Sequence, residues 1–405
     1  MRRTLRLPVA LVAAIVVAEG AVLVLRPRES GPEPVMVDAR AYFSPAQVEK
    51  GRDFRRGQLG LYGARLLIEG GLLILLVRHP PRRLRLRDFR RPVLAGAATA
   101  AALSVALGLA ALPVRAIARE RVKDVGLVTQ SATDWLGDVA KGELIGGAIA
   151  GAGGALLLFG MRSFGPRWWA PGAAVVVAFG IVITYAGPVV LDPVFNDFTR
   201  LPAGQTRSDV LELAGRAGVK VGEVYEVDAS RRTTAANAYV TGLGSTKRVV
   251  LYDNLLKDFT PAETRLVVAH ELGHVRHHDV SHGLLYLAIV APFGMLAVAL
   301  LSERLAPREG SYTPAALPAV ALAIALVVPV ITIISNQLSR AVERRADAFA
   351  LELTREPRTM IEFQRGIAVK NVSDVDPPEW QTFLLATHPP TLQRIGAAVA
   401  FERRR

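Results

Sequence analysis

Long apolar runs dominate the 405-residue sequence and restrict its fold more than any other feature. There are seven, each of about 18 to 22 residues, or about 27 to 33 Å as an α-helix, which is enough to cross the hydrocarbon core of a bilayer. They lie at 8–25, 59–77, 93–114, 144–161, 173–191, 284–302 and 314–334. The sequence therefore predicts a mainly α-helical membrane protein with seven transmembrane helices.

The first run follows MRRTLR and has an alternative interpretation as a secretory signal peptide. It is long for the apolar region of a signal peptide, and no small-x-small cleavage site closes it before the polar stretch RPRESGPEP. We predict a retained membrane anchor.

Charge and cysteine content narrow the possible partners. The net charge of +13 comes from arginines beside the apolar runs, as in RHPPRRLRLRDFRRP (78–92), which holds seven arginines. This is typical of residues that face anionic lipid headgroups, so we expect the lipid bilayer as a partner and no nucleic acid. The absence of cysteine excludes disulfides and thiolate ligands, which leaves histidine and carboxylate to hold any metal.

The polar segments between the runs define four regions. Residues 1–191 hold five spans and, at 26–58, a charged loop; 192–283 form a small α/β domain; 284–334 hold two spans; and 335–405 form a helical segment. In the second region, 208–219 has helical periodicity, while 222–228 and 247–253 are rich in β-branched and aromatic residues, typical of strands. A third strand is expected between them, within TTAANAYVTGLGS.

The stretch TPAETRLVVAHELGHVRHHD has the signals of a helix start. Thr260 is suited to the N-cap, Pro261 to the first helical position, and Glu263 to the capping box.

Two histidines on this helix form a metal-binding pattern. His270 and His274 are four residues apart and lie on one face, and Glu271 projects beside them. In His-Glu-x-x-His on a helix, the two histidines bind zinc and the glutamate is the general base.

A catalytic zinc site needs a third protein ligand. His278 lies on the same face, but a straight helix does not wrap three successive turns around one tetrahedral ion. A metzincin arrangement needs glycine at 277 and histidine at 280, whereas the sequence has His277 and Val280. In NQLSRAVERRADAFALEL (336–353), Glu343 and Asp347 are four residues apart, so that one can bind the metal and the other orient a neighbour.

Together these motifs resemble a known family. HELGH, an apolar span pair, SRAVERRADAFA and ATHPPTLQRI are similar to the type I CAAX prenyl proteases, integral-membrane zinc endopeptidases related to bacterial heat-shock membrane metalloproteases. The resemblance extends through YFSPAQVEKGRDFRRGQ, PVFNDFTRLPAG and NAYVTGLGSTKRVVLYDNLL. Seven spans favour the prenyl-protease branch, whereas Asp279, where those enzymes usually have histidine, is shared with the heat-shock branch.

The resemblance implies one zinc ion per chain and a role for each matching residue. The ligands would be His270, His274 and Glu343, with Glu271 as the general base and Asp347 as a support behind the ligands. His388 and Arg394 would line the active site and contact the substrate carbonyl, and Asn237 and Ala238 would pair with the substrate backbone.

Three functions follow from these observations. The first is a membrane-embedded zinc endopeptidase that hydrolyses membrane-associated or prenylated, CAAX-like peptides. The second is a bacterial quality-control protease for membrane proteins, without prenyl specificity. The third is a non-enzymatic seven-span receptor or transporter with an accidental metal motif.

Ionisable residues within the spans have two interpretations. Glu19, Arg65 and Glu69 match the lining of the aqueous chamber that the family's seven helices enclose, or Arg65 and Glu69 neutralise one another.

We expect a multi-pass protein of the plasma membrane. Arginine counts in the short loops place the N-terminal side in the cytoplasm and the zinc domain outside. The eukaryotic relatives carry their zinc domain in the cytosol, and the zinc side of this chain is basic too. We therefore expect the zinc domain on the cytoplasmic side, as in the family.

Overall fold

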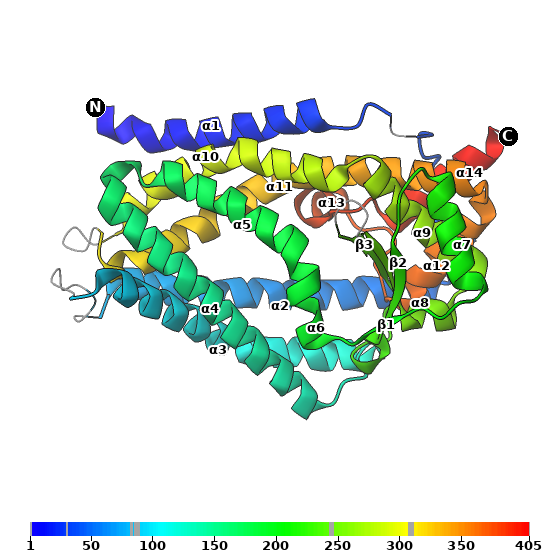
Figure 1. Ribbon diagram of the computed structural model, residues 1–405, viewed down its shortest axis with the longest axis horizontal. Helices are drawn as coiled ribbons and strands as arrows, with labels where there is room; N and C mark the ends of the chain where they lie inside the picture. The colour runs from blue at the N-terminus through cyan, green and yellow to red at the C-terminus, as the bar shows by residue number, and fades with distance from the viewer. Residues whose placement is uncertain are drawn as a thin grey trace.

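The protein is a helical membrane bundle joined to a small sheet-containing unit (Figure 1). The computed structural model describes residues 2–29, 31–81, 84, 90–242, 247–306 and 312–404, so residues 82, 83 and 85–89 of the arginine-rich stretch 78–92 lie outside the described residues. Its residues are 77% helical, with one four-stranded sheet. The predicted fold class is confirmed.

Seven helices are long and apolar enough to span a membrane, and each contains a predicted run apart from a few residues at its ends. They are α1 (Arg2–Leu25), α2 (Pro45–Arg78), α3 (Pro92–Asp124), α4 (Ala132–Phe164), α5 (Trp169–Val190), α10 (Asp279–Leu305) and α11 (Leu317–Thr354). An α-helix satisfies most of its backbone polar groups within itself, which the hydrocarbon core requires.

The spanning helices contact one another in a closed order. Around the ring, α11 contacts α2, followed by α3, α4, α5 and α10, which returns to α11, while α1 packs on α10 and α11. Figure 1 shows α10 and α11 on one side of the ring and α2 and α3 on the opposite side. The arrangement agrees with the helical barrel expected from the family resemblance.

The polar segment before the second span differs from the prediction. Residues 26–58 were expected as a loop, but α2 begins at Pro45 and absorbs the charged residues up to the apolar run. A capping box starts it, since Ser44 Oγ accepts from Gln47 N at 3.2 Å and Gln47 Oε1 accepts from Ser44 N at 2.9 Å. At about 51 Å for 34 residues, α2 is longer than a bilayer core of about 30 Å.

Pairing explains the ionisable residues of two spans. Arg65 Nε donates to Glu69 Oε1 at 2.7 Å on the same helix, so these side chains neutralise one another. Glu19 on α1 accepts from Gln337 Nε2 on α11 at 3.2 Å.

The sheet has the strand order β1-β2-β4-β3. Its strands are β1 (Phe198–Arg200), β2 (Glu223–Val227), β3 (Ala238–Thr241) and β4 (Arg248–Tyr252). β2 and β4 are parallel, and the two outer strands are antiparallel to their neighbours. The strands predicted at 222–228, 247–253 and within 233–245 are present, whereas β1, three residues without an apolar alternation, was not predicted.

Further helices follow the fifth span in the chain or flank the sheet. They are α6 (Asp192–Phe195), α7 (Gln205–Arg216), α8 (Asp253–Asp258), α9 (Pro261–Arg276), α12 (Pro357–Lys370), α13 (Glu379–Leu385) and α14 (Thr391–Arg403). One apolar cluster joins the sheet to α7, α8, α9, α11, α12 and α14. Leu251, Leu272 and Leu351 in it are fully buried, which fixes α9 and α11 relative to each other and to β4.

One helix connects the membrane bundle to this unit. α11 runs without a break from the apolar run 314–334 into the polar residues that follow. Its second half packs against α9. The carboxylates of this half are therefore held by a rigid helix rather than by a loop.

Candidate metal centre

The predicted start of the His-Glu-x-x-His helix is confirmed. Thr260 Oγ1 accepts from Glu263 N at 3.3 Å, while Glu263 Oε2 accepts from Thr260 N at 2.8 Å, so both partners of the capping box are satisfied. α9 ends at Arg276, and His278, with φ of 57°, turns the chain into α10. This turn separates His278 from the two motif histidines.

Two helices bring three donor groups to one point. His270 and His274 on α9 and Glu343 on α11 each offer an atom within 4.8 Å of the others. The two Nε2 atoms lie 3.2 Å apart, and the Glu343 oxygens lie 3.3 Å from His270 Nε2 and 3.5 Å from His274 Nε2. Two ligands about 2.1 Å from a tetrahedral ion are about 3.4 Å apart, so the spacing fits one zinc-sized cation.

The surroundings of the two imidazoles also fit a cation. His270 Nδ1 lies 2.9 Å from Asp347 Oδ1, and His274 Nδ1 lies 2.9 Å from Asp279 Oδ2. A neutral imidazole whose proton is on Nδ1 has its lone pair on Nε2, so this tautomer would leave both Nε2 atoms free to bind one ion. Glu343 Oε2 is buried beside the two imidazoles and has no hydrogen-bond partner among the described residues.

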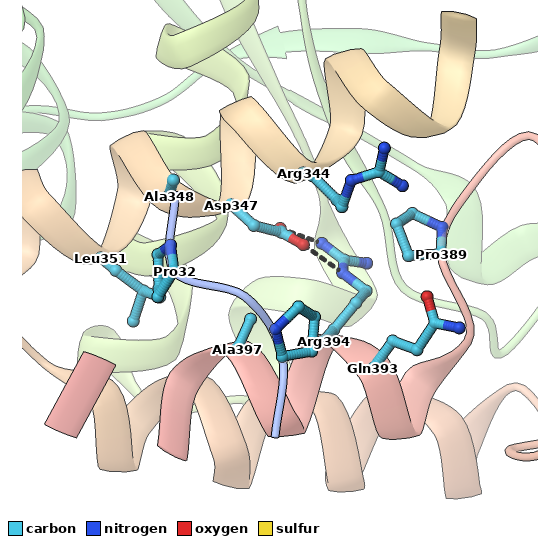
Figure 2. Close-up of a pocket in the computed structure, with 10 residues that line it drawn as sticks. Pro32, Arg344, Asp347, Ala348, Leu351, Pro389, Gln393, Arg394 and Ala397 are labelled. Atoms are coloured by element: carbon cyan, nitrogen blue, oxygen red, sulfur yellow. Dashed lines mark hydrogen bonds and ion pairs between the residues drawn. The ribbon is translucent and has the colours of Figure 1, made fainter. Parts of the chain in front are cut away.

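Asp347 is held from the other side by an arginine. Arg394 on α14 donates to both carboxylate oxygens, from Nε at 2.8 Å and from Nη2 at 2.5 Å (Figure 2). Asp347 is 3% exposed, and it lines a small pocket together with Pro32 from the segment before α2 (Figure 2). This bidentate pair fixes the carboxylate that orients His270. The support of a metal ligand by Asp347 remains a prediction of the resemblance.

Asp279 has a role that the sequence analysis did not assign. It follows the end of α9 by three residues and lies at the start of α10, where one oxygen faces His274 Nδ1 and the other bonds Arg345. Arg345 therefore holds Asp279 as Arg394 holds Asp347. The sequence did contain a signal for this contact, namely a carboxylate five residues after His274. Once α9 ends, a turn can bring that carboxylate back to the His274 imidazole.

Glu271 and His388 line one cavity of about 470 Å³ together with His270, Arg394 and Asn237. Burial raises the pKa of the Glu271 carboxyl, which makes it a stronger base than an exposed glutamate. His388 Nε2 lies 3.3 Å from Glu343 Oε2, and burial lowers the pKa of its imidazole. The cavity therefore brings a buried carboxyl group and an imidazole beside the candidate metal-ligand group.

The apolar part of this cavity is formed between α9 and α12. Leu266, Val267, Met360, Phe363 and Ile367 line it.

The sheet edge borders the same cavity. Asn237 lines it directly, whereas Ala238 is 3% exposed and its N–H donates to Asn237 Oδ1 at 2.9 Å. Among the described strands β3 pairs with β4 alone, so its other side is an edge of the sheet. A peptide in an extended conformation can add to such an edge.

Comparison with known proteins places the chain in a family. The model of peptidase family M48 matches residues 200–402, and that of the CAAX prenyl protease N-terminal region, five membrane helices, matches residues 73–197. An uncharacterized metalloprotease, YhfN, of Bacillus subtilis (strain 168) is 31% identical over 303 residues, which are 73% of this chain and 71% of that protein. A CAAX prenyl protease 1 homolog of Oryza sativa subsp. japonica is 30% identical over 226 residues, 54% of this chain and 53% of that protein.

The fold has a counterpart among solved structures. The crystal structure of S. mikatae Ste24p matches with a TM-score of 0.70 at 18% identity and covers 98% of this chain and 99% of that chain. The fold and the family models together define a membrane metalloprotease. The chain belongs to peptidase family M48. This membership confirms the resemblance and excludes the non-enzymatic receptor or transporter.

Asp279→Asn tests the support of His274. We expect metal affinity to fall by about 10- to 100-fold, because the neutral amide no longer stabilises the Nδ1 proton and the ring orientation. Competition with a chelator in detergent measures the affinity. The control is Asp53→Asn, which alters an exposed carboxylate on α2. Equal affinities of the two variants would contradict the assignment.

Proposed function

We propose that this protein is a zinc-dependent endopeptidase that hydrolyses peptide bonds of membrane-associated or prenylated, CAAX-like peptides. The observation that carries the proposal is that the group of His270, His274 and Glu343 adjoins a cavity lined by Glu271 and His388. One zinc ion per chain would have two imidazoles and one carboxylate as protein ligands. Its fourth position would remain open for water or substrate, as catalytic sites require.

The residues around the ion have distinct tasks. When bound, zinc supplies a Lewis acid that polarises the scissile carbonyl and lowers the pKa of a bound water to about 7. Glu271 accepts the proton of the attacking water and delivers it to the departing amine. His388 and the remaining amino group of Arg394 donate to the carbonyl oxygen as it becomes negative.

The substrate is held by its backbone. An extended peptide would pair with Ala238 at the edge of β3 and contact the side chain of Asn237, whose own carbonyl accepts from Tyr252 N. This positions the scissile bond without demanding one sequence. The spanning helices keep the site near the bilayer, where peptides anchored by lipid or by a membrane span are concentrated. We assign the protein to the plasma membrane with the metal centre on the cytoplasmic side, as in the eukaryotic relatives.

Two quenched peptides of one sequence, one with a farnesylated cysteine, test the substrate class. The purified protein in detergent should cleave both, with a higher kcat/KM for the farnesylated peptide. A chelator should abolish the activity and zinc should restore it. Equal kcat/KM for the two peptides would instead assign quality control of membrane proteins, and hydrolysis that survives chelation would contradict the proposed mechanism.

A further inference from the structure

A stripe of polar residues runs along one face of the second half of α11. Asn336, Arg340, Glu343 and Asp347 are spaced by four, three and four residues, which places them on one side of the helix. Glu343 and Asp347 belong to the candidate metal centre, whereas Asn336 and Arg340 lie outside its donor group. The partners of Asn336 and Arg340 show what the rest of the stripe does.

Asn336 and Arg340 bind the carbonyl end of α13. Asn336 Nδ2 donates to Leu384 O at 3.1 Å. Arg340 Nη1 donates to Thr382 O at 2.9 Å and to Ala386 O at 2.6 Å. The last carbonyls of a helix lack partners within it, and these two side chains supply donors for those of Leu384 and Ala386. α11 therefore holds the end of α13 by its backbone.

The connection that follows α13 carries His388. Only Thr387 separates the anchored carbonyl of Ala386 from this histidine. The imidazole is only partly buried, with 58% of the side chain exposed, so packing alone does not fix its place 3.3 Å from Glu343 Oε2. The position of His388 therefore depends on how its backbone is held.

Two further features restrict the same connection. His388 precedes Pro389, and a residue before proline is biased toward extended conformations. The two prolines before α14 have fixed φ angles and lead directly into that helix. Arg394 on α14 is bound to Asp347, so α11 holds the downstream end of the connection as well (Figure 2). Few conformations remain open to the connection once both of its ends are fixed.

Successive positions of the α11 stripe contact successive positions of the chain from α13 to α14. The pairs are Asn336 with Leu384, Arg340 with Ala386, Glu343 with His388, and Asp347 with Arg394. His388 thus lies between two anchored points, one upstream at Arg340 and one downstream at Asp347. The helix that carries the candidate third ligand also fixes the distance of His388 from that ligand.

We propose that Arg340 is a positioning residue for His388. It fixes the end of α13 on α11 and so holds the imidazole within reach of the carbonyl oxygen that becomes negative during hydrolysis. The inference rests on the proposed peptidase function, in which His388 donates to that oxygen. Arg340 itself is outside the donor group and the cavity lining, so its effect on the reaction passes through the chain that it anchors.

A double-mutant cycle on hydrolysis of a quenched peptide in detergent tests this assignment. Arg340→Ala should lower kcat by about tenfold or more and leave KM and zinc affinity within about twofold, because a misplaced donor weakens binding of the transition state alone. His388→Ala should lower kcat by about 10²- to 10³-fold. The double variant should match His388→Ala within about twofold, because the effects of residues that act as a unit do not add.

Arg365→Ala, the same change at an exposed position of α12, is the control and should match the wild type. Losses that multiply in the double variant, or an unchanged kcat in Arg340→Ala, would overturn the positioning role. Loss of zinc affinity in Arg340→Ala would make Arg340 a support of the metal centre and would overturn it as well. Absence of hydrolysis by the wild type would overturn the peptidase function, whereas the anchor itself is decided separately by hydrogen exchange.

Hydrogen exchange separates the anchor from the stability of the whole fold. In Arg340→Ala, amide exchange in α13 should become about tenfold faster and that in α9 should stay within about twofold, because only the end of α13 loses bonds to α11. Equal exchange of α13 in this variant and in the wild type would overturn the anchor. Faster exchange of α9 and α13 together would make Arg340 a support of the whole fold and would overturn its specific role for His388.

Discussion

The Glu271→Gln variant is expected to retain one metal ion per chain and to lose peptide hydrolysis by about 10²- to 10⁴-fold, the usual contribution of a general base. The amide keeps the shape of the side chain but cannot accept the proton of water. Glu271 is outside the donor group of His270, His274 and Glu343, so metal binding does not depend on it. Elemental analysis and hydrolysis of a quenched peptide in detergent measure the two quantities on the same sample.

The matched control is Glu362→Gln, the same change at an exposed position of α12. It should leave both metal content and turnover unchanged. Equal turnover of wild type and Glu271→Gln would exclude Glu271 as the base, whereas loss of metal along with turnover would make it a ligand.

The Glu343→Gln variant is expected to lose metal affinity by more than about 100-fold, beyond the 10- to 100-fold loss typical of residues that only orient a ligand. Glu343 is the one carboxylate of the donor group, and its replacement leaves two imidazoles facing each other without an anionic ligand. Hydrolysis should fall with the metal content. Titration of the metal-free protein with zinc gives the affinity.

Glu352→Gln is the control for this variant, because it changes an exposed glutamate further along α11. Its affinity should match that of the wild type. Retention of metal by Glu343→Gln would place the third ligand elsewhere and would remove the basis for joining α9 and α11 in one site. Circular dichroism before and after zinc addition separates loss of a ligand from loss of the fold.

The spanning helices were predictable because lipid leaves the backbone few options. A run of about 20 apolar residues must satisfy its own hydrogen bonds there, so run length alone predicts a helix. The charged start of α2 was not predictable in this way. Helix formation there depends on the capping box of Ser44 and Gln47 and on tertiary contacts such as that of Gly51, which lies against the chain at Ser373.

The residues of the metal centre also differed in how far the sequence alone could predict them. His270, Glu271 and His274 could be recognised because helical geometry fixes side chains four residues apart on one face. The choice between Glu343 and Asp347 as ligand needed the family resemblance, because nothing local distinguishes two carboxylates on one helix face. The support of His274 by Asp279 was missed, since it depends on the turn at His278 that brings the start of α10 back to the ring.

The sequence by itself determined seven membrane-spanning helices, the capped helix with two histidines and a glutamate, and the ligand chemistry, because each depends on spacing within a few turns of one element. Only the tertiary structure decided that the α11 carboxylate faces the histidine pair, that arginines on α11 and α14 bind Asp279 and Asp347, and that Val128 of the membrane bundle bridges Thr233 before β3. These contacts join residues far apart in the chain. The buried core that joins α9, α11 and the sheet sets their positions, and no local pattern encodes it.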